Sequence, residues 1–325
     1  MKVNLFYLSG NTTGGWVTYT SHMCKGLKGF SLFKVGNRTE TKSRPFGYGL
    51  DYVNLSLDDA VRQVHSGPSL IVALQKNWRE KAEKLIDAGA WTVIHDPAEF
   101  KHFDMKVVGP RSITIRKAVH SQVRGSHLLL HPYQRHYQEG TLATREIRAC
   151  SISRIDFDKR TDILLDANRL LPPGLRIDIH GFENRIYTRF KLCPKYPEWE
   201  QSVAHYARED RRAADICHSS WYSVDMSVIK GDGGGTQYTF LESMDAGSVN
   251  VINSQWIIPG DEMVPYPRPS ANCVTAGNGQ ELAAVLRSND VLGTCDNIVR
   301  AGESLMRNHR AEVIAQELLD LLSKG

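Results

Sequence analysis

The sequence lacks the features that mark membrane, exported and repetitive proteins. Among its 325 residues, no apolar run approaches the roughly 20 residues of a membrane-spanning helix. The N-terminal segment MKVNLFYLSG has one lysine and a short strand-like run, which is not the pattern of a signal peptide. There is no internal repeat and no low-complexity segment. We therefore expect a cytoplasmic globular protein that is not bound to a membrane.

Paired cysteines are also absent. No two cysteines have the CxxC spacing that zinc sites use, so a structural zinc site is not expected. Single, scattered cysteines are typical of reduced thiols in the cytosol. The six cysteines lie at positions 24, 150, 193, 217, 273 and 295.

Neither sign of charge is in large excess. The formal net charge is +4 and the isoelectric point is about 8.6, which permits an anionic partner without requiring one. Hydrophobic residues make up 41% of the chain and charged residues 23%, a balance that excludes intrinsic disorder. The length suggests two domains of ordinary size.

What the sequence does contain is an alternation of strand and helix patterns. This order predicts an α/β protein with parallel sheets that are covered by helices on both faces. Ligands of such sheets bind beyond the carboxyl ends of the strands. Strands are expected at 3–8, 69–75, 91–96, 105–110, 112–115, 127–132, 147–153, 175–181 and 248–253, and helices at 14–27, 79–89, 159–171, 198–216, 237–246 and 298–323.

The segment KGDGGGTQYTFLESMDAGSVNVI, which begins at Lys230, is the most informative part of the chain. Glycines at 233–235 precede an apolar helix for which Thr236 is the expected N-cap. Free N–H groups at the start of that helix favour a phosphate. Glu242, nearly two turns further on, offers a carboxylate that can accept two hydrogen bonds from a ribose diol. The segment therefore predicts a nucleotide diphosphate site, although a tight loop with a solvated glutamate is an equally simple interpretation.

This segment resembles the C-terminal signature of GT-B glycosyltransferases, a glycine-rich turn followed by Glu-Ala-Met-x-x-Gly and an apolar strand. The resemblance implies two Rossmann-like domains with sheets facing across a cleft, and it implies that Glu242 and Thr236 contribute to the nucleotide-sugar site. The family usually has a second glutamate eight residues earlier, where this chain has Gly234, followed by Gly235. That departure indicates an unusual subfamily and a changed contact to the donor sugar.

Other parts of the chain fit the same resemblance. Gly14 and Gly15 open a helix after the first strand, as in the N-terminal domain of the family, near the donor phosphate or the acceptor. Arg154 and Lys159 follow a strand and supply the two cations that a leaving diphosphate needs. Arg160 is an alternative to Lys159. The segment RRAADICHSS, at 211–220, resembles the family's strand beside the nucleotide, and HPYQR resembles the turn before its interdomain linker.

His95 and Asp96 end the apolar run WTVI, at the edge of the sheet where a site in this fold lies. A carboxylate there can orient or deprotonate an acceptor hydroxyl, and a neutral imidazole can hydrogen-bond a sugar hydroxyl. The simpler alternative is that Asp96 caps the turn before Pro97. The family resemblance favours a catalytic role for both residues. It also implies retention of the anomeric configuration, with the leaving phosphate helping to take the proton.

A similar His-Asp pair and a similar Tyr-Thr-x-Leu-Glu segment occur in phage DNA α-glucosyltransferases. The resemblance implies transfer from UDP-glucose to a hydroxymethylated cytosine or uracil in double-stranded DNA of a bacteriophage, in the host cytoplasm. Phosphates of the DNA would meet basic residues of the N-terminal domain, and an aromatic side chain would stack or wedge where a base is flipped. A second basic and aromatic run, at 185–199, is a candidate lid or DNA-contacting insertion. The N-terminal candidates are Lys76, Trp78, Arg79, Arg111, Arg116, Lys117, His120, Arg124 and His127.

The resulting prediction has three domains or segments. Residues 1–138 form an acceptor-binding domain, 146–300 a nucleotide-sugar-binding domain, and 301–325 a helix that packs back toward the first. We expect a monomer that needs no cofactor and no metal besides the nucleotide sugar, because positive groups and helix amides hold the diphosphate. The alternatives are a GT-B glycosyltransferase of saccharides, lipids or small molecules, and a non-catalytic protein that binds nucleotides or nucleic acid.

Overall fold

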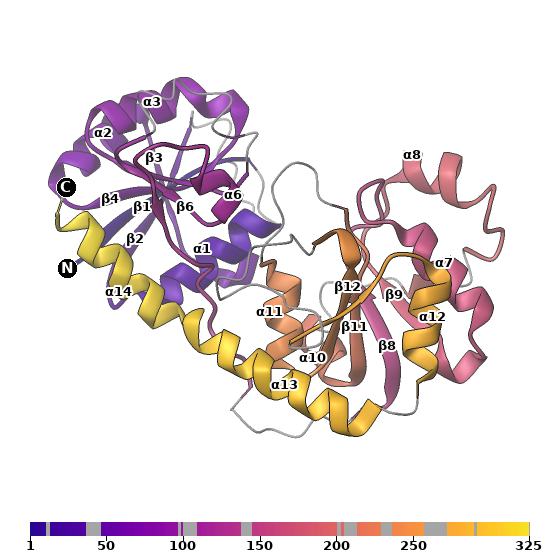
Figure 1. Ribbon diagram of the computed structural model, residues 1–325. Coiled ribbons are helices and arrows are strands. Elements are labelled where there is room, and N and C mark those ends of the chain that lie inside the picture. Colours follow the sequence, from indigo (N-terminus) through magenta and orange to yellow (C-terminus); the bar gives the residue numbers. More distant parts are fainter. Residues whose placement is uncertain are drawn as a thin grey trace. The chain divides into compact units, whose positions relative to one another are not determined.

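We analysed a computed structural model of the chain, shown in Figure 1. Within the residues that it describes, no helix combines the length and the apolar character needed to span a membrane. The described residues are 1–10, 14–36, 47–96, 99, 109–137, 145–199, 203–204, 213–228, 236–256, 272–288 and 291–324.

The chain divides into two compact units. One unit comprises Met1–Gln134 and Asn308–Gly325, and the other comprises Arg135–Lys230 and Gly234–Arg307. Each unit has one parallel sheet and its own hydrophobic core. The α/β class expected from the sequence is therefore confirmed in both units.

The first unit contains a seven-stranded sheet in the order β3-β2-β1-β4-β5-β6-β7, with every pair parallel. Its strands are β1 (Val3–Leu8), β2 (Phe30–Val35), β3 (Val53–Leu55), β4 (Ser69–Leu74), β5 (Trp91–Ile94), β6 (Ser112–Thr114) and β7 (His127–Leu128). Its helices are α1 (Gly15–Gly26), α2 (Leu57–Ser66), α3 (Arg79–Asp87), α6 (Lys117–His120) and α14 (Ala311–Leu322).

Burial explains why the central strands of this sheet read as continuous apolar runs. All six residues of β1 and all six of β4 are buried, as expected for strands covered on both faces. Phe6 and Leu8 pack in one cluster with Ala60 of α2 and Leu85 of α3. Figure 1 shows α1 and α14 on the opposite side of the sheet from α2 and α3.

The second unit contains a six-stranded parallel sheet in the order β10-β9-β8-β11-β12-β13. Its strands are β8 (Ile147–Ile152), β9 (Ile177–His180), β10 (Val203–Ala204), β11 (Ser220–Asp225), β12 (Val249–Asn253) and β13 (Val274–Ala276). Its helices are α7 (Thr161–Leu170), α8 (Arg185–Tyr187), α10 (Ala213–His218), α11 (Tyr238–Asp245), α12 (Gly279–Arg287) and α13 (Val291–Asn308), and a π-helical turn at Thr188–Leu192 continues α8.

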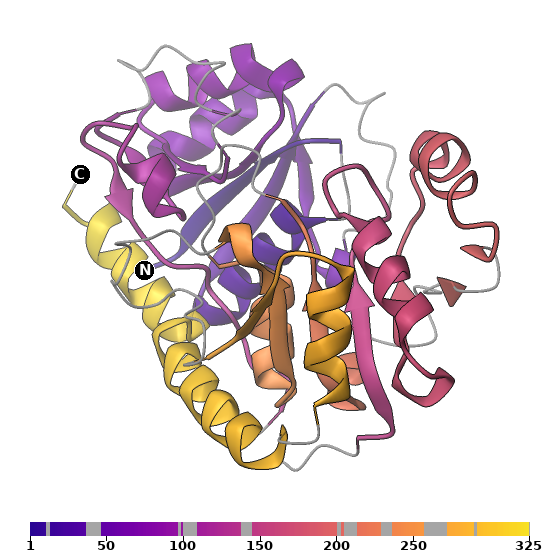
Figure 2. The same ribbon diagram turned by 45° about the vertical axis from the view of Figure 1, so that its right-hand side comes forward.

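Alternate residues of the second sheet pack on opposite layers of helices. Val249 and Val251 of β12 belong to a core cluster with residues of α7 and α12. Ile252, the next residue along β12, packs with Phe240 of α11 instead. Figures 1 and 2 show α7 and α12 on one side of this sheet, and α10 and α11 on the other.

Three expectations about secondary structure were wrong. The helix expected at 198–216 is confirmed only from Ala213 on, where α10 begins, because the short strand β10 lies at Val203–Ala204. The strand expected within 211–220 is the helix α10, and the strand follows it as β11. The C-terminal helix expected at 298–323 is two helices, α13 and α14, which are separated by His309 and Arg310. Most of the strand expected at 105–110 lies outside the described residues.

The strand orders locate the place in each unit where a ligand can bind. In each unit the first strand is β1 or β8. The strands that follow it in sequence are placed first on one side of it and later on the other. The order therefore reverses between β1 and β4 in the first sheet and between β8 and β11 in the second. In open parallel sheets, ligands bind beyond the carboxyl ends of the strands at such a reversal. These two edges carry the candidate site residues.

The C-terminal helix α14 is fixed to the first unit by close helix packing. Tyr133 N donates to His309 O at 2.7 Å, and Ala311 N donates to Tyr133 O at 3.0 Å. At the crossing of α1 and α14, a Cβ added to Gly26 would overlap the backbone carbonyl group of Ala311. The two helices can approach this closely only because Gly26 has no side chain.

We predict that Gly26→Ala lowers the free energy of unfolding by about 1–3 kcal/mol, because a backbone carbonyl cannot move aside as a flexible side chain can. Urea unfolding of the full chain measures this difference. Gly174→Ala is the matched control, since a Cβ there meets no atom within 4 Å. Equal destabilisation by the two substitutions would contradict the packing argument.

Candidate active site

At the edge of the second sheet, Lys159 bridges the two strands between which the order reverses. Lys159, in the loop after β8, donates from Nζ to Ser227 Oγ at 2.9 Å. Ser227, just after β11, donates its hydroxyl proton to Asp225 Oδ1. Lys159 is half-buried, and Asp225 and Ser227 are buried. The arrangement holds a positive charge at the carboxyl ends of β8 and β11.

The residues that lead into the glycine-rich segment are held by backbone and side-chain contacts. Val228 N donates to Asp158 O at 2.9 Å, which ties the segment to the loop after β8. From β12 and the turn after it, Asn253 Nδ2 donates to Met226 O at 3.1 Å and Trp256 Nε1 donates to Ser227 O at 2.7 Å. The last described residues before the glycines are therefore fixed on both sides.

The helix that follows the glycines begins one residue later than expected. Its N-cap is Gln237, in an extended conformation, and not Thr236. Phe240 N and Leu241 N both donate to Gln237 O, so the helical hydrogen bonds begin at that residue. Thr236 is buried just before the helix. Gly234 and Gly235, also predicted to bind the donor, lie outside the described residues.

Glu242 lies about one turn inside α11 and is partly buried. Desolvation, and then the charge of Asp245, raises the pKa of Glu242 to about 7. Within the part of the chain that the structure describes, no hydrogen-bond donor contacts its carboxylate. Asp245, by contrast, is paired with Arg135 at 2.8 Å and accepts from His136 N at 2.6 Å. Glu242 thus retains both oxygens for a ligand.

Arg154 and Arg160 are both engaged with aspartates. Arg154 is 63% exposed and pairs with Asp156 at 3.0 Å and Asp158 at 3.5 Å. Arg160 has a left-handed backbone, with φ 49°, and pairs with Asp162 at 2.9 Å. Of the three cations predicted near the diphosphate, Lys159 is the one held between the two strand ends.

The sequence Asp156-Phe157-Asp158 is an Asp-x-Asp pattern, which the expectation of a metal-free site did not take into account. Besides its pairing with Arg154, Asp156 accepts from Asn184 Nδ2 at 2.9 Å and from Phe157 N at 2.8 Å. Its carboxylate oxygens are therefore used within the protein. Among the described residues, no three side chains of metal-ligating type converge on one point.

In the first unit, Gly14 and Gly15 lie at the start of α1, beyond the carboxyl end of β1. Gly14 has φ 100°, a conformation that favours glycine, and accepts the first helical hydrogen bonds from Val17 and Thr18. A Cβ added to either glycine would meet no atom within 4 Å among the described residues. The backbone at this helix start is therefore open to a ligand.

His95 follows β5 and is buried. Its Nε2 lies 2.9 Å from Val72 O, and because a carbonyl oxygen only accepts, Nε2 carries the proton. Burial lowers the pKa of His95 to about 4, so the imidazole is neutral at physiological pH. The edge of its ring system meets Tyr19, with the ring centres 4.8 Å apart. A neutral His95 retains Nδ1 as its acceptor.

Asp96, the next residue, has a half-exposed side chain and a distant cation. Its Oδ1 lies 3.9 Å from Nε of Arg116, whose own side chain is only 12% exposed. Arg116 was predicted to contact DNA phosphates, but the structure places it inside the protein beside Asp96. At this separation the pair contributes little to stability. Asp96 is thus more exposed to solvent than His95.

Glu99 is a buried residue of this edge that the sequence analysis missed. Its Oε2 accepts from His95 N at 2.7 Å, and its Oε1 accepts from Trp16 Nε1 at 2.8 Å. Desolvation, and then the charge of Asp96, raises the pKa of Glu99 to about 8. Glu99 thereby ties the end of β5 to the first turn of α1, so that it connects two predicted site segments.

Two of the missed residues had a recognisable signal in the sequence. Asp225 ends the apolar run SWYSV, and Ser227 follows it by two residues, as polar residues at the carboxyl end of a buried strand do. The misplaced strand at 211–220 concealed this. Glu99 had no such signal, because burial of one glutamate in a loop leaves no periodic pattern.

The predicted DNA-contacting residues of the first unit are unequal candidates. Trp78 packs partly against the hydrophobic core, and Lys81 Nζ lies 4.2 Å from its ring centre, so this ring is not a free wedge. His120 Nδ1 is 2.9 Å from Ser126 Oγ. Lys76, Arg79, Arg111 and Arg124 are exposed or partly exposed, and Lys117 and His127 are half-buried.

Comparisons with known proteins place this architecture. No model of a known protein family matches the sequence, and no curated protein matches it. Solved structures do match over nearly the full chain. The Anabaena protein HepE in complex with UDP and glucose superposes with a TM-score of 0.74 at 15% identity, covering 100% of both chains.

Two further solved structures show the same likeness. An α-glucosyltransferase in complex with UDP-glucose and DNA containing an abasic site has a TM-score of 0.71 at 12% identity, covering 99% of both chains. A glycosyltransferase from Rickettsia africae has a TM-score of 0.67 at 12% identity, covering 99% of this chain and 98% of that one. At these identities the likeness shows the fold alone. The chain has the α/β fold of the GT-B glycosyltransferases.

We predict that Glu99 makes stability depend on pH. Because its pKa is raised from 4.5 to about 8, the folded state keeps a proton that the unfolded state loses. The contribution of Glu99 to the free energy of unfolding is therefore fully present at low pH. It falls by up to about 1.4 kcal/mol per pH unit as the pH rises from 4.5 to about 8. Glu99→Gln cannot ionise and removes this fall, although it exchanges an acceptor oxygen for an amide donor.

Urea unfolding of wild type and Glu99→Gln at a series of pH values measures the effect. The free energy of unfolding of wild type minus that of the variant should decrease as pH rises. Glu80→Gln, on the exposed side of α3, is the control and should follow wild type. A constant difference between wild type and Glu99→Gln would contradict the assignment.

Proposed function

We propose that this protein is a glycosyltransferase that moves a sugar from a nucleotide sugar, UDP-glucose by default, to the hydroxymethyl group of a modified pyrimidine in double-stranded DNA. The observation that carries the proposal is the pairing of Lys159 with Ser227 at the strand-order reversal of the second sheet. Beside it, α11 carries Glu242, whose carboxylate has no hydrogen-bond donor among the described residues. The fold shared with solved glycosyltransferases supports the same assignment.

The donor half of the reaction follows from the charges at this edge. The bond between the anomeric carbon and the diphosphate oxygen breaks, so negative charge grows on the diphosphate. Lys159 and the N–H groups at the start of α11 stabilise that charge, with Arg154 at the rim. Glu242 accepts hydrogen bonds from the ribose diol. The nucleotide-sugar donor would thus be held by Arg154, Lys159, Gly234, Gly235, Thr236 and Glu242, with Gly14 and Gly15 near its phosphates.

The acceptor half uses groups of the first unit. The hydroxymethyl oxygen attacks the anomeric carbon, and its proton passes to the departing phosphate oxygen, with retention of configuration. Asp96 orients the attacking hydroxyl, and neutral His95 accepts a hydrogen bond from a sugar hydroxyl at Nδ1. Glu99 is a positioning residue that fixes the His95 backbone. Since the donor is bound by amides and cations, we propose that the reaction needs no metal.

We predict that Glu242 makes donor affinity depend on pH. Its pKa is raised from 4.5 to about 7, so the fraction of Glu242 that is ionised falls as pH decreases below that value. A protonated carboxyl accepts fewer hydrogen bonds from the ribose, so the Kd for UDP-glucose should rise by up to about tenfold per pH unit. Calorimetric titration of wild type with UDP-glucose across this range measures the change.

Glu242→Gln should bind UDP-glucose more weakly at alkaline pH and show little pH dependence. The matched control is Glu317→Gln on the exposed side of α14, which should bind as wild type does. Unchanged affinity in Glu242→Gln would mean that the ribose contact is wrongly assigned.

We predict that labelled sugar is transferred to DNA that contains hydroxymethylcytosine or hydroxymethyluracil, and not to unmodified DNA. Nucleotide sugars of several kinds should be tested, with release of free sugar measured in parallel. Asp96→Asn should transfer about a hundredfold more slowly while it binds UDP-glucose normally, because its carboxylate acts on the acceptor. Wild-type turnover by this variant would make Asp96 a turn residue.

The remaining outcomes separate the alternatives. Donor hydrolysis without labelled DNA would retain the glycosyltransferase and move the acceptor to saccharides, lipids or small molecules. Absence of both turnover and nucleotide-sugar binding would contradict the proposal and favour a non-catalytic binding protein.

A further inference from the structure

The region around α8 exposes large hydrophobic side chains to solvent. Phe182, Ile186 and Phe190 are 60%, 64% and 64% exposed, and Phe157 is 49% exposed. Four of the ten exposed large hydrophobic side chains among the described residues thus lie in one region. Ile155 N donates to Phe182 O at 2.9 Å, and the Phe157 and Tyr187 rings are 4.9 Å apart, so the two contributing loops are in contact. Solvent exposure of several large apolar groups in one place indicates a binding surface.

Exposed cations stand among these hydrophobic groups. Arg185 and Arg189 are four residues apart on α8 and its π-helical continuation, and so are Ile186 and Phe190, so a basic row runs beside an apolar row. The Arg189 guanidinium lies 5.5 Å from the Phe190 ring centre. We call this set the α8 surface: Phe157, Phe182, Arg185, Ile186, Arg189, Phe190 and Lys191.

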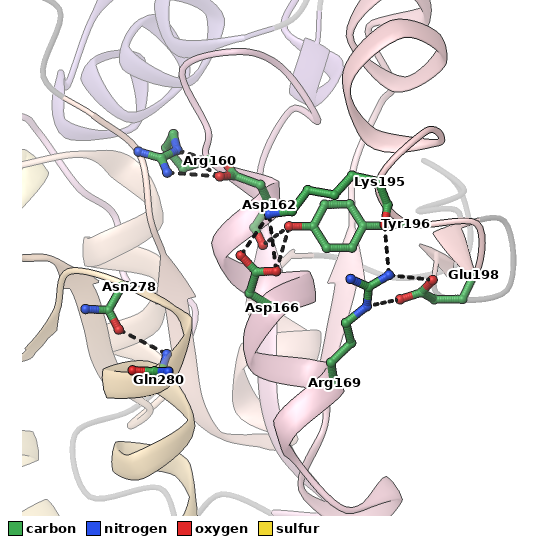
Figure 3. Close-up of polar contacts among 9 residues, drawn as sticks. All are labelled: Arg160, Asp162, Asp166, Arg169, Lys195, Tyr196, Glu198, Asn278 and Gln280. Carbon is green, nitrogen blue, oxygen red and sulfur yellow. Dashed lines mark hydrogen bonds and ion pairs between the residues drawn. The ribbon is translucent and has the colours of Figure 1, made fainter.

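The cations of the α8 surface differ from their neighbours in having no acidic partner among the described residues. Figure 3 shows Lys195 paired with Asp166 at 3.2 Å and Arg169 paired with Glu198 at 2.7 Å. For Arg185, Arg189 and Lys191, no ion pair is made with any residue that the structure describes. Between 181 and 192 these three cations are accompanied by one acid, Glu183. The surface therefore complements a polyanion.

The α8 surface is held on a rigid base. Tyr187, Leu192 and Tyr196, on the inner side of the same segment, are buried in the core cluster of the second unit. Tyr196 also donates from its hydroxyl to Asp166 Oδ1 at 2.8 Å, as Figure 3 shows. The segment at 185–199 is therefore a fixed part of the unit and not a lid.

The α8 surface lies at the same edge of the second sheet as the candidate donor site. Ile155 and Asn184 belong to the loops that follow β8 and β9, the same edge of the sheet that carries Lys159. Asn184 N donates to Ile155 O at 2.9 Å, which joins the two loops. The α8 surface is thus a neighbour of the loop with Arg154 and Lys159.

We propose that the α8 surface binds a nucleic-acid strand beside the modified base, with Arg185, Arg189 and Lys191 on phosphates and the phenylalanine rings against bases. This inference rests on the proposed function, since it specifies how the DNA acceptor is held. Exposed aromatic rings flanked by cations are the combination that binds unpaired strands without sequence preference. A base that leaves the duplex to be modified creates such unstacked neighbours.

An anionic membrane is the alternative ligand for a surface with exposed cations and hydrophobic groups. Membrane-surface helices bury a long apolar face in the lipid interface. Here the helical stretch from Arg185 to Leu192 directs Tyr187 and Leu192 into the protein core, leaving Ile186 and Phe190 outside. Three of the four exposed apolar groups are rings, which suit bases. The observations therefore favour nucleic acid.

Two full-length variants test the proposal. Arg185→Gln/Arg189→Gln/Lys191→Gln removes the charges, and Phe182→Ala/Phe190→Ala removes two rings. Binding of a fluorescein-labelled duplex with one hydroxymethylcytosine is measured by anisotropy over a range of salt concentrations. The charge variant should reduce the slope of log K against log salt by about 0.9 for each phosphate that the variant no longer neutralises. The ring variant should weaken binding about 5- to 150-fold for each base that is deprived of its stacking partner.

The matched control removes three exposed charges elsewhere, as Arg62→Gln/Arg300→Gln/Lys324→Gln, and should leave the affinity and its salt dependence near wild type. All variants should bind UDP-glucose as wild type does, which separates this test from that of the donor site. Sedimentation with vesicles of phosphatidylserine and phosphatidylcholine tests the membrane alternative.

Wild-type DNA affinity in both α8-surface variants, or no DNA binding by wild type, would overturn the inference. So would loss of vesicle binding by the variants with DNA binding retained. If the α8-surface variants transfer sugar to DNA as fast as wild type does, the proposed function is supported but the role of this surface is not. Conversely, DNA binding through the α8 surface without any sugar transfer would support the surface and overturn the proposed function.

Discussion

The parallel pairing of β8 with β9 on one side and β11 on the other determines where the second unit can bind a ligand. Because β8 is the first strand of its unit, the chain runs outward to β9 and later returns to pair β11 on the opposite side. The loops after β8 and β11 therefore begin side by side at the edge of the sheet where ligands of this fold class bind. Lys159 can reach Ser227 only because these two loops start next to each other.

Two carboxylates at this edge have different surroundings. Asp225 accepts hydrogen bonds from Ser227 N and from the hydroxyls of Ser227 and Thr239. Glu242 has no such donor among the described residues, and burial beside Asp245 raises its pKa. Asp225 is therefore part of the framework that positions Lys159, whereas the described residues leave the carboxylate of Glu242 without a hydrogen-bond donor.

The fold was largely predictable because it depends on patterns that span many residues, and the site was less so because it depends on single contacts. Runs such as VNLFYL and SLIVAL are buried on both faces and form β1 and β4 as expected. The short run AADICH fits a strand or a helix equally well, and the helix expected up to 216 was right there while the strand drawn from the family resemblance was wrong. Burial of Glu99 and the partners of Arg116 depend on segments that meet only in the folded chain.

The two units offer chemically different edges, which suit the two halves of a sugar transfer. In the first unit, burial keeps His95 neutral and favours the protonated form of Glu99, so the edge is set up for hydrogen bonds to uncharged hydroxyls. In the second unit, Lys159 and Arg154 add positive charge at the strand ends beside the start of α11. An anionic diphosphate gains more from the second edge than from the first, since cations and helix amides stabilise it where it forms. This difference in charge, and not the fold alone, is why we propose the second unit for the donor and the first for the acceptor hydroxyl.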